Sequence, residues 1–291
     1  DKGSVVHPRT GEVLAPAALG SDVFRLDHHV DPREQLAEWM TQPDNPFFAR
    51  TMVNRMWAHF LGRGIIHPID DARSTNPPSN PKLLDALAAD FVASGYDIKQ
   101  LIRSITNSYA YRLDSVPTDG NAEDTQSFAR FYPRRMSAEV LLDGISQVLD
   151  VPTQFASGAG MFPTGTRAID LPDENVPAAF LDIFGRPGRM SACECERVDA
   201  PALTQALELV NSAEIQRKLT EATGFAHQIA LTETSNSDRA TRIFLRTLGR
   251  APRTEELKIS VDYLDGQSDP QEACRSLLWS LLATNEFLFN H

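Results

Sequence analysis

The stretch NPFFARTMVNRMWAHFL, residues 45–61, decides the fold expected for the first part of the chain. Asn45 followed by Pro46 is typical of a helix start, because an asparagine side chain caps free N–H groups and proline fits the first turn. At about 100° per residue, one face of this helix carries apolar and polar side chains together: Phe47, Arg50, Asn54, Trp57 and Leu61. The remaining surface is also mostly apolar. Since a helix that is apolar nearly all round is buried, we expect this one in a protein core.

Polar side chains on a buried helix need partners, because an unpaired polar group in a core costs free energy. We therefore expect Arg50 to be largely buried and paired with an acid from the 67–80 loop or with Glu139. The acids considered as partners are Asp70, Asp71 and Glu139. Two interpretations stay open. Either Arg50, Asn54 and Trp57 form a pocket for a sugar or a carboxylate, or an internal salt-bridge network holds the loop to the helix.

The combination of a capping residue and a proline recurs along the chain: Asp31-Pro32, Asn80-Pro81 and Asp269-Pro270. Apolar residues at helical spacing follow each start. A sustained alternation of apolar and polar residues, which would indicate strands, is missing from the sequence. The sequence therefore predicts an all-α fold that is mainly helical, with long irregular loops and little or no sheet.

Composition divides the chain into four parts: an extended lead-in over residues 1–30, a first helical lobe over 31–149, a Gly/Pro-rich loop segment over 150–199 and a second helical lobe over 200–291. We expect the two lobes to pack together as one domain. A loop as long as 150–199 inside a compact domain is uncommon and is often functional. We therefore expect a site between the first lobe and this segment.

The chain has 291 residues and a formal net charge of −11, with 42% hydrophobic and 23% charged residues. Such a composition is typical of a globular protein. An acidic surface repels phosphate backbones, so nucleic acid is not an expected partner. The longest apolar run, near residues 277–283, is far shorter than the ~20 residues that a membrane span needs. We therefore do not expect the chain to span a membrane.

The string CECER, residues 193–197, is unusual. Cys193 and Cys195 can form a small, strained disulfide in an oxidising compartment, or they can remain free thiols packed among ion pairs. Zinc sites prefer two to four residues between cysteines, so a metal is the less favoured alternative and no metal site is assigned. Because the Cys-x-x-Cys-His motif is missing, we expect no haem and no other cofactor in this chain. Cys274 lies on an apolar helix and is expected to be inert.

Arginines and acids near turns form a second group of candidate binding residues: Arg134, Arg135, Arg186, Arg189, Arg197, Glu139, Glu194 and Glu196. Because arginine favours planar, bidentate partners, these side chains can bind an acidic sugar or pair with one another. Asp70 and Asp71 suggest catalysis by paired carboxylates. Neighbouring residues in an extended segment point to opposite faces, however, so a second acid such as Glu139 or Glu194 would be needed. Calcium binding by this loop and simple pinning of the loop are the alternatives.

Several strings of the sequence match one family: 45–50 with 52–57, 70–73 with 76–81, 94–97, 132–135 with 138–139, 184–187, 193–197 and 286–291. Through them the chain resembles the C-terminal domain of unknown function found in large planctomycete proteins that carry a cytochrome c domain. The resemblance implies an extracytoplasmic location, in a periplasm-like compartment or at the cell surface. It also implies that haem c lies in a separate domain of the same polypeptide or complex. The family has no established catalytic residues to carry over.

Three hypotheses about function follow from these observations. The first is a non-haem module that binds a substrate, polysaccharide above all, and presents it to a redox partner domain. The second is an enzyme with an acidic or thiol site near Asp70, Asp71, Glu139 and Cys193. The third is a purely structural cell-surface scaffold. Under the first hypothesis we expect carbohydrate binding that is lost in Arg186→Ala or Arg197→Ala without loss of folding.

Overall fold

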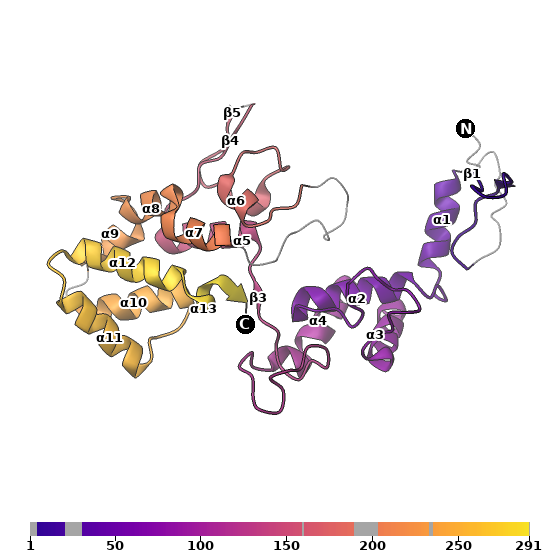
Figure 1. Ribbon diagram of the computed structural model, residues 1–291, viewed down its shortest axis with the longest axis horizontal. Helices are drawn as coiled ribbons and strands as arrows, with labels where there is room; N and C mark the ends of the chain where they lie inside the picture. The colour runs from indigo at the N-terminus through magenta and orange to yellow at the C-terminus, as the bar shows by residue number, and fades with distance from the viewer. Residues whose placement is uncertain (1–4, 21–30, 159, 189–202, 233–234, 291) are drawn as a thin grey trace. The chain divides into compact units, whose positions relative to one another are not determined.

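The computed structural model of the protein describes residues 5–20, 31–158, 160–188, 203–232 and 235–290 (Figure 1). The described residues are 52% helical and 5% strand, which confirms the predicted mainly helical fold. It divides into two compact units, Asp1–Tyr132 and Pro133–His291. Within the described residues, no helix is both long and apolar enough to cross a membrane.

The first unit consists of a short hairpin followed by helices. Its elements are β1 (Val5–Val6), β2 (Val13–Leu14), α1 (Pro32–Thr41), α2 (Phe48–Leu61), α3 (Pro81–Ala93), α4 (Ile98–Thr106) and the 3-10 turn η1 (Ala110–Arg112). Helices α2, α3 and α4 pack on one another, and their apolar side chains form the core of this unit. Thr51, Arg55 and His59 are exposed, so α2 is buried on one side rather than nearly all round as expected.

Three predicted helix starts are confirmed, each by a side-chain oxygen that accepts from a backbone N–H: Asp31 from Arg33, Asn80 from Leu83 and Asp269 from Gln271. The fourth start differs slightly, because α2 begins at Phe48 rather than at Pro46. The side-chain oxygen of Asn45 accepts from the N–H groups of Phe47 at 2.9 Å and Phe48 at 3.0 Å, in the turn that leads into the helix. The N-cap residue is Phe47, which has no side-chain cap, so the cap predicted at Asn45 lies two residues too early.

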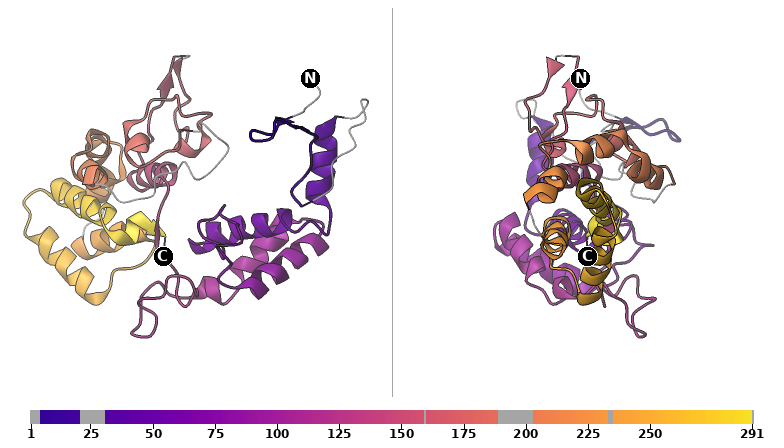
Figure 2. Two further views of the ribbon diagram at one scale, coloured as in Figure 1. Left: turned by 45° about the vertical axis from the view of Figure 1, so that its right-hand side comes forward. Right: turned by 90° about the vertical axis from the view of Figure 1, so that its left-hand side faces the viewer.

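The second unit is a larger helical assembly with two short strand pairs. Its elements are β3 (Arg134–Arg135), α5 (Ala138–Leu149), β4 (Ala156–Ser157), β5 (Gly160–Met161), η2 (Ala168–Asp170), α6 (Ala179–Ile183), α7 (Leu203–Asn211), α8 (Ala213–Thr220), α9 (Phe225–Thr232), α10 (Asn236–Leu248), α11 (Thr254–Asp265), α12 (Pro270–Leu282), α13 (Asn285–Leu288) and β6 (Phe289–Asn290). Helix α5 contacts η2, α6, α8 and α9. Helices α10, α11 and α12 pack on one another (Figure 2). Strands β3 and β6 pair antiparallel, with Arg135 opposite Phe289, so the last strand returns to the start of the unit.

The internal boundary differs from the one expected from composition. Helix α5, which composition places in the first lobe, belongs to the second unit because its apolar face lies in that unit's core. The described part of the Gly/Pro-rich segment also contributes buried core side chains: Phe155, Leu171, Val176, Phe180, Leu181 and Phe184. These residues have no regular spacing, so their burial leaves no periodic pattern in the sequence. The segment therefore helps to build the core of the second unit.

Candidate functional site

Arg50 does not occupy the buried position expected for it. Its side chain is 38% exposed, and its partner is Asp85 on α3, with Nη1 and Oδ1 3.2 Å apart. The prediction of a buried pair with the 67–80 loop or with Glu139 was therefore wrong. A long arginine side chain can reach solvent from the edge of a buried face, and Arg50 does so.

Asn54 makes the contact with the loop that was expected of Arg50. This side chain is 1% exposed, and its Oδ1 accepts from the N–H of Ile66 at 2.8 Å. Its Nδ2 donates to the carbonyls of Ile66 at 2.9 Å and Ile69 at 3.0 Å. The approach requires Gly64, because a Cβ at that position would lie 2.2 Å from the Ile66 carbonyl oxygen. An internal network does hold the loop to the helix, and its central group is an amide.

Asp70 and Asp71 are paired with different arginines. Asp70 accepts from Arg55 Nε at 2.9 Å, and Asp71 lies 2.8 Å from Arg73 Nε. The backbone carbonyl of Asp71 also accepts from Asn76 Nδ2 at 2.9 Å. Among the described residues, no group of three or more His, Cys, Asp or Glu side chains is placed to hold a metal ion. The geometry of these two acids therefore agrees with a pinned loop.

Trp57 is the predicted site residue that borders an open space. We use the name Trp57 recess for a hollow of about 340 Å³ lined by residues of the first unit: Trp57, Ser79, Asn80, Leu83, Ala110, Gln126, Ser127 and Phe128. The indole is 3% exposed and packs edge-on against Phe128, with ring centroids 5.3 Å apart. Its Nε1–H is buried and meets no acceptor in the described part of the chain. The walls therefore combine aromatic rings with uncharged amides and hydroxyls.

The arginines of the second unit for which the structure shows contacts are bound to the protein itself. Arg186 is 8% exposed, with Nη2 2.6 Å from Asp182 Oδ1 and Nη1 donating to the Val176 carbonyl at 3.0 Å. Arg135 Nη2 donates to the Phe184 carbonyl at 3.0 Å, and its guanidinium lies over the Phe184 ring. These contacts support a structural role for Arg186, so Arg186→Ala is expected to disturb folding. The contacts do not support its predicted role as a sugar-binding residue that can be replaced without loss of folding.

The remaining candidates of this group give less information. Arg134 lies on β3 and Glu139 is buried on α5. The candidates that fall outside the described residues are Arg189, Cys193, Glu194, Cys195, Glu196 and Arg197. Cys274 is buried on α12, and burial raises the pKa of its thiol. A raised pKa disfavours the reactive thiolate, in agreement with the inert role expected for this residue.

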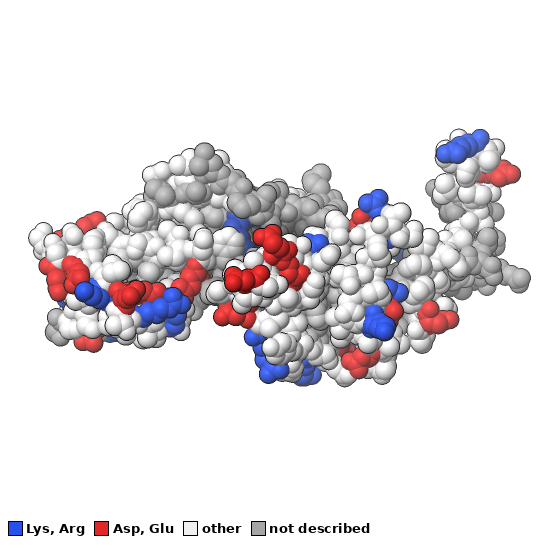
Figure 3. Space-filling model, turned by 60° about the horizontal axis from the view of Figure 1, so that its bottom comes forward, with Lys and Arg blue, Asp and Glu red and all other residues white. Residues whose placement is uncertain are grey.

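Charged side chains are mixed over the surface. Figure 3 shows acidic and basic side chains side by side on the face that it displays, with broad uncharged areas between them. The pairs Arg50–Asp85, Arg55–Asp70 and Arg73–Asp71 all lie at least partly in solvent. Exposed pairs of this kind contribute little to the free energy of unfolding. Within each pair the positive and the negative charge largely cancel. Net charge alone therefore does not locate a binding site, and the uncharged Trp57 recess is the more informative feature.

A buried lysine in the second unit was not predicted. Lys218 is 0% exposed, and its Nζ donates to the Val151 carbonyl at 2.7 Å and to Ser146 Oγ at 3.1 Å. Glu214 Oε1 lies 3.6 Å from Nζ and also accepts from Thr153 Oγ1 at 2.8 Å. A serine beside a lysine can form a nucleophile and its base. Here the ammonium donates two hydrogen bonds and pairs with Glu214, and the serine hydroxyl bonds to the Leu142 carbonyl, so the contacts are those of a structural clamp.

We expect Lys218 to give the protein a distinct pH dependence. Burial lowers the pKa of this lysine from 10.5 to about 8. Between these values the unfolded chain binds more protons than the folded chain, so the free energy of unfolding should rise with pH, by about 1 kcal/mol between pH 8 and about pH 9. Lys218→Met should lack this rise. Urea unfolding over this pH range measures it, with the exposed Lys258→Met as the matched control. Identical pH slopes in the wild type and Lys218→Met would contradict the assignment.

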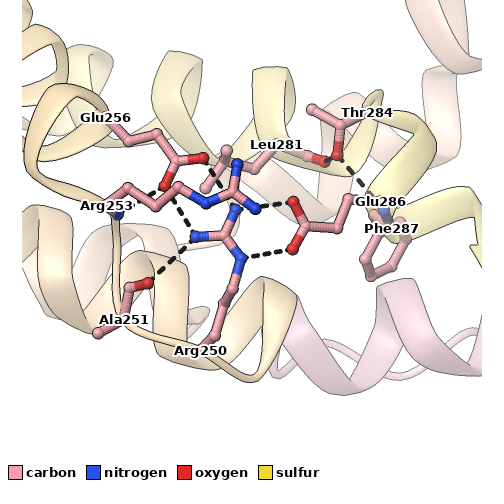
Figure 4. Close-up of polar contacts among 8 residues, drawn as sticks. All are labelled: Arg250, Ala251, Arg253, Glu256, Leu281, Thr284, Glu286 and Phe287. Carbon is pink, nitrogen blue, oxygen red and sulfur yellow. Dashed lines mark hydrogen bonds and ion pairs between the residues drawn. The ribbon is translucent and has the colours of Figure 1, made fainter. Parts of the chain in front are cut away.

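A second unpredicted network joins three helices of the second unit (Figure 4). Arg250 follows α10 and binds two carboxylates in bidentate fashion: Glu256 on α11 and Glu286 on α13. The shortest distances are 2.7 Å to Glu256 and 2.5 Å to Glu286. Glu256 also accepts from the N–H of Arg253 at 2.6 Å, at the start of α11. The hydrogen bond from Arg250 lowers the pKa of Glu256 from 4.5 to about 2.

Comparison with known proteins defines a family without a known activity. Neither a curated protein nor a solved structure matches the chain. The sequence profile of one family matches residues 32–264, which include the helices of the first unit and most of the second. The chain belongs to this family, described as PSD1: Protein of unknown function (DUF1553).

Proposed function

We propose that the chain is a carbohydrate-binding module and that the Trp57 recess is its binding site. The observation that carries this proposal is a hollow of about 340 Å³ whose walls combine two aromatic rings with uncharged polar groups. Small-molecule sites typically span roughly 300–1,000 Å³ and pair apolar walls with a few polar groups. A sugar ring suits such walls, because its C–H face packs on aromatic side chains while its hydroxyls exchange hydrogen bonds with amides and hydroxyls.

The distribution of charge supports an uncharged sugar. The side chains that line the Trp57 recess carry no formal charge, and Asn80, Gln126 and Ser127 offer both donors and acceptors. Arg135 and Arg186, which could have recognised an acidic sugar, are instead bound to backbone carbonyls of their own unit. An acidic ligand would have to leave water without gaining a cationic partner in the recess, which is unfavourable.

The same proposal includes a setting outside the cytoplasm and a redox partner. Its support is the resemblance to C-terminal domains that accompany a cytochrome c domain. In this arrangement haem c belongs to a separate domain, and the present chain holds the polysaccharide where that domain can act on it. Purification of the full-length protein from its natural source, followed by haem staining of the polypeptide and location of the protein in cell fractions, tests this part.

An enzymatic function is less well supported. Asp70 and Asp71, the acids proposed for catalysis, each bind an arginine and are partly exposed. Catalytic carboxylates usually need separate environments that set one pKa high and the other low. Here both carboxylates have the same kind of partner, an arginine side chain. The scaffold alternative predicts that the intact chain binds no glycan.

Binding of neutral oligosaccharides to the intact chain tests the proposal directly. We expect Gln126→Ala combined with Ser127→Ala to weaken binding about tenfold or more, since each lost hydrogen bond costs about 1 kcal/mol. Both side chains are exposed, so the helical circular dichroism signal should not change. Thr125→Ala, an exposed neighbour outside the recess, is the matched control. A chain that binds no glycan, or a double variant that binds as tightly as the wild type, would refute the proposal.

A further inference from the structure

One wall of the Trp57 recess is a loop rather than a helix. Gln126, Ser127 and Phe128 line the recess from this loop, and they lie outside regular secondary structure. Ordering a free loop costs conformational entropy, and a binding site that is ordered only when the ligand arrives loses affinity by that amount. A loop that lines a site therefore benefits from contacts that fix its shape beforehand.

Asp124 supplies most of these contacts. Its Oδ1 accepts from the N–H groups of Gln126 at 3.2 Å and Ser127 at 2.9 Å. Its Oδ2 accepts from the N–H of Ala129 at 2.9 Å and from the Tyr132 hydroxyl at 2.8 Å. The Tyr132 oxygen in turn accepts from the N–H of Phe128 at 2.9 Å. The backbone N–H groups of residues 126–129 thus all end on one carboxylate and its hydroxyl partner.

The conformation held in this way is one that the loop would not adopt freely. Phe128 has a φ of 55°, in the left-handed region that non-glycine residues rarely occupy. This backbone accompanies the edge-on packing of its ring against Trp57, with centroids 5.3 Å apart. Strained residues persist where surrounding contacts over-determine them, and they gather at binding sites. Without Asp124, residue 128 would be free to relax and the wall of the recess would change shape.

The ionisation of Asp124 agrees with this role. Burial alone would raise its pKa, but the hydrogen bonds from the Ala129 N–H and its neighbours outweigh that effect and hold the pKa well below its usual value. A carboxylate that accepts several N–H bonds makes shorter and stronger contacts than a neutral acceptor. The carboxylate therefore stays charged at neutral pH.

We infer that Asp124 is the positioning residue of the sugar site: it shapes the loop 124–132 into a wall of the Trp57 recess before the ligand arrives. The inference rests on the proposed function, because it concerns the affinity of the same recess. Asp124 itself does not line the recess. It acts through Gln126, Ser127 and Phe128, and its substitution should affect binding more than the stability of the helical core.

Graded substitutions of Asp124 in the intact chain test this inference. Asp124→Ala removes every contact and should weaken the binding of a neutral oligosaccharide about tenfold, because the ligand must then order the loop. Asp124→Asn keeps one oxygen for Gln126 and Ser127 but loses the bonds to Ala129 and Tyr132. Its affinity should fall between those of Asp124→Ala and the wild type. Tyr132→Phe, which frees the Phe128 N–H, should weaken binding to a similar intermediate level.

Controls separate loop shape from general stability and from the absence of a ligand. Asp119→Ala, which removes an exposed acid five residues before Asp124, should bind like the wild type. Amide hydrogen exchange should show faster exchange at residues 126–129 in Asp124→Ala, with unchanged protection in α2, α3 and α4. Wild-type affinity in Asp124→Ala would overturn this inference while leaving the sugar site intact. A wild type that binds no oligosaccharide overturns the proposed function, and the inference with it.

Discussion

Asn54→Ala is expected to lower the free energy of unfolding of the first unit by about 3 kcal/mol. The alanine removes three hydrogen bonds and leaves the N–H and C=O of buried Ile66 without their partner. An unsatisfied buried polar group costs about 1–3 kcal/mol, far more than the net gain from an average hydrogen bond. The loop that carries Gly64, Ile66 and Ile69 should also lose its fixed position on α2.

Chemical denaturation of the whole chain, combined with amide hydrogen exchange, measures both effects. Exchange should accelerate throughout the first unit and most strongly at residues 64–69, while α10, α11 and α12 stay protected. Arg50→Ala, one helical turn earlier, is the matched control. Its pair with Asp85 is partly exposed, so its loss should cost at most about 1 kcal/mol. Equal destabilisation by the two substitutions would show that the ion pair matters as much as the amide.

Local chemistry made the helix starts predictable. At Asp31, Asn80 and Asp269 the capping oxygen bonds to an N–H two or three residues away. Both partners are neighbours in the sequence, so the pattern alone is sufficient. The sequence does not reveal to which unit a helix belongs. The apolar face of α5 would suit either core, and only long-range packing assigns it to the second unit.

The sequence could identify the important face of α2 but not the depth of each residue on it. Arg50, Asn54 and Trp57 do share that face, yet they are 38%, 1% and 3% exposed. Helical periodicity gives the direction of a side chain, whereas its burial depends on what packs above it. Asn54 is covered by the 64–69 loop, and Arg50 lies beside α3. An amide was the better candidate for a buried contact, because burying an arginine charge costs more than burying an amide.

The loop wall of the recess and the two networks of the second unit were beyond sequence reasoning. Gln126, Ser127 and Phe128 lie in a segment without periodicity, and their neighbour Trp57 is distant in the chain. Lys218 on α8 reaches the Val151 carbonyl, and Arg250 reaches Glu286, across 67 and 36 residues of sequence. One retrospective signal exists at Asp124, because Asp followed by short polar residues is typical of a side chain that bonds to its own backbone.

Arg250→Met should lower the free energy of unfolding of the second unit by about 3 kcal/mol, the lower end of the range for breaking a buried ion pair. Arg250, Glu256 and Glu286 are 27%, 30% and 30% exposed, which places the cost below that of a fully buried group. Methionine keeps much of the apolar stem but removes the guanidinium that joins the two carboxylates. The ends of α10, α11 and α13 should then separate more easily.

The stability that this network contributes should decrease as the pH falls. Because the folded-state pKa of Glu256 is lowered from 4.5 to about 2, its contribution is complete above about pH 4.5 and is lost as the pH falls toward 2. The wild type should therefore lose stability over this range, and Arg250→Met should lose less, since its Glu256 is no longer held in the charged form. Arg217→Met, which removes an exposed arginine of the same unit, should match the wild type throughout.

A double substitution separates the network from the loss of packing at Arg250. In Arg250→Met alone, part of the cost is repulsion between the two carboxylates that Arg250 no longer joins, and Glu286→Gln removes one of those charges. The double variant should therefore lose less free energy of unfolding than the two single variants lose together. The difference, which is the coupling energy, should be about 1 kcal/mol or more. Urea unfolding of the four proteins at neutral pH gives this coupling. Strictly additive losses of stability would mean that Arg250 stabilises the helix ends by packing, and that its bonds to the carboxylates in Figure 4 contribute nothing.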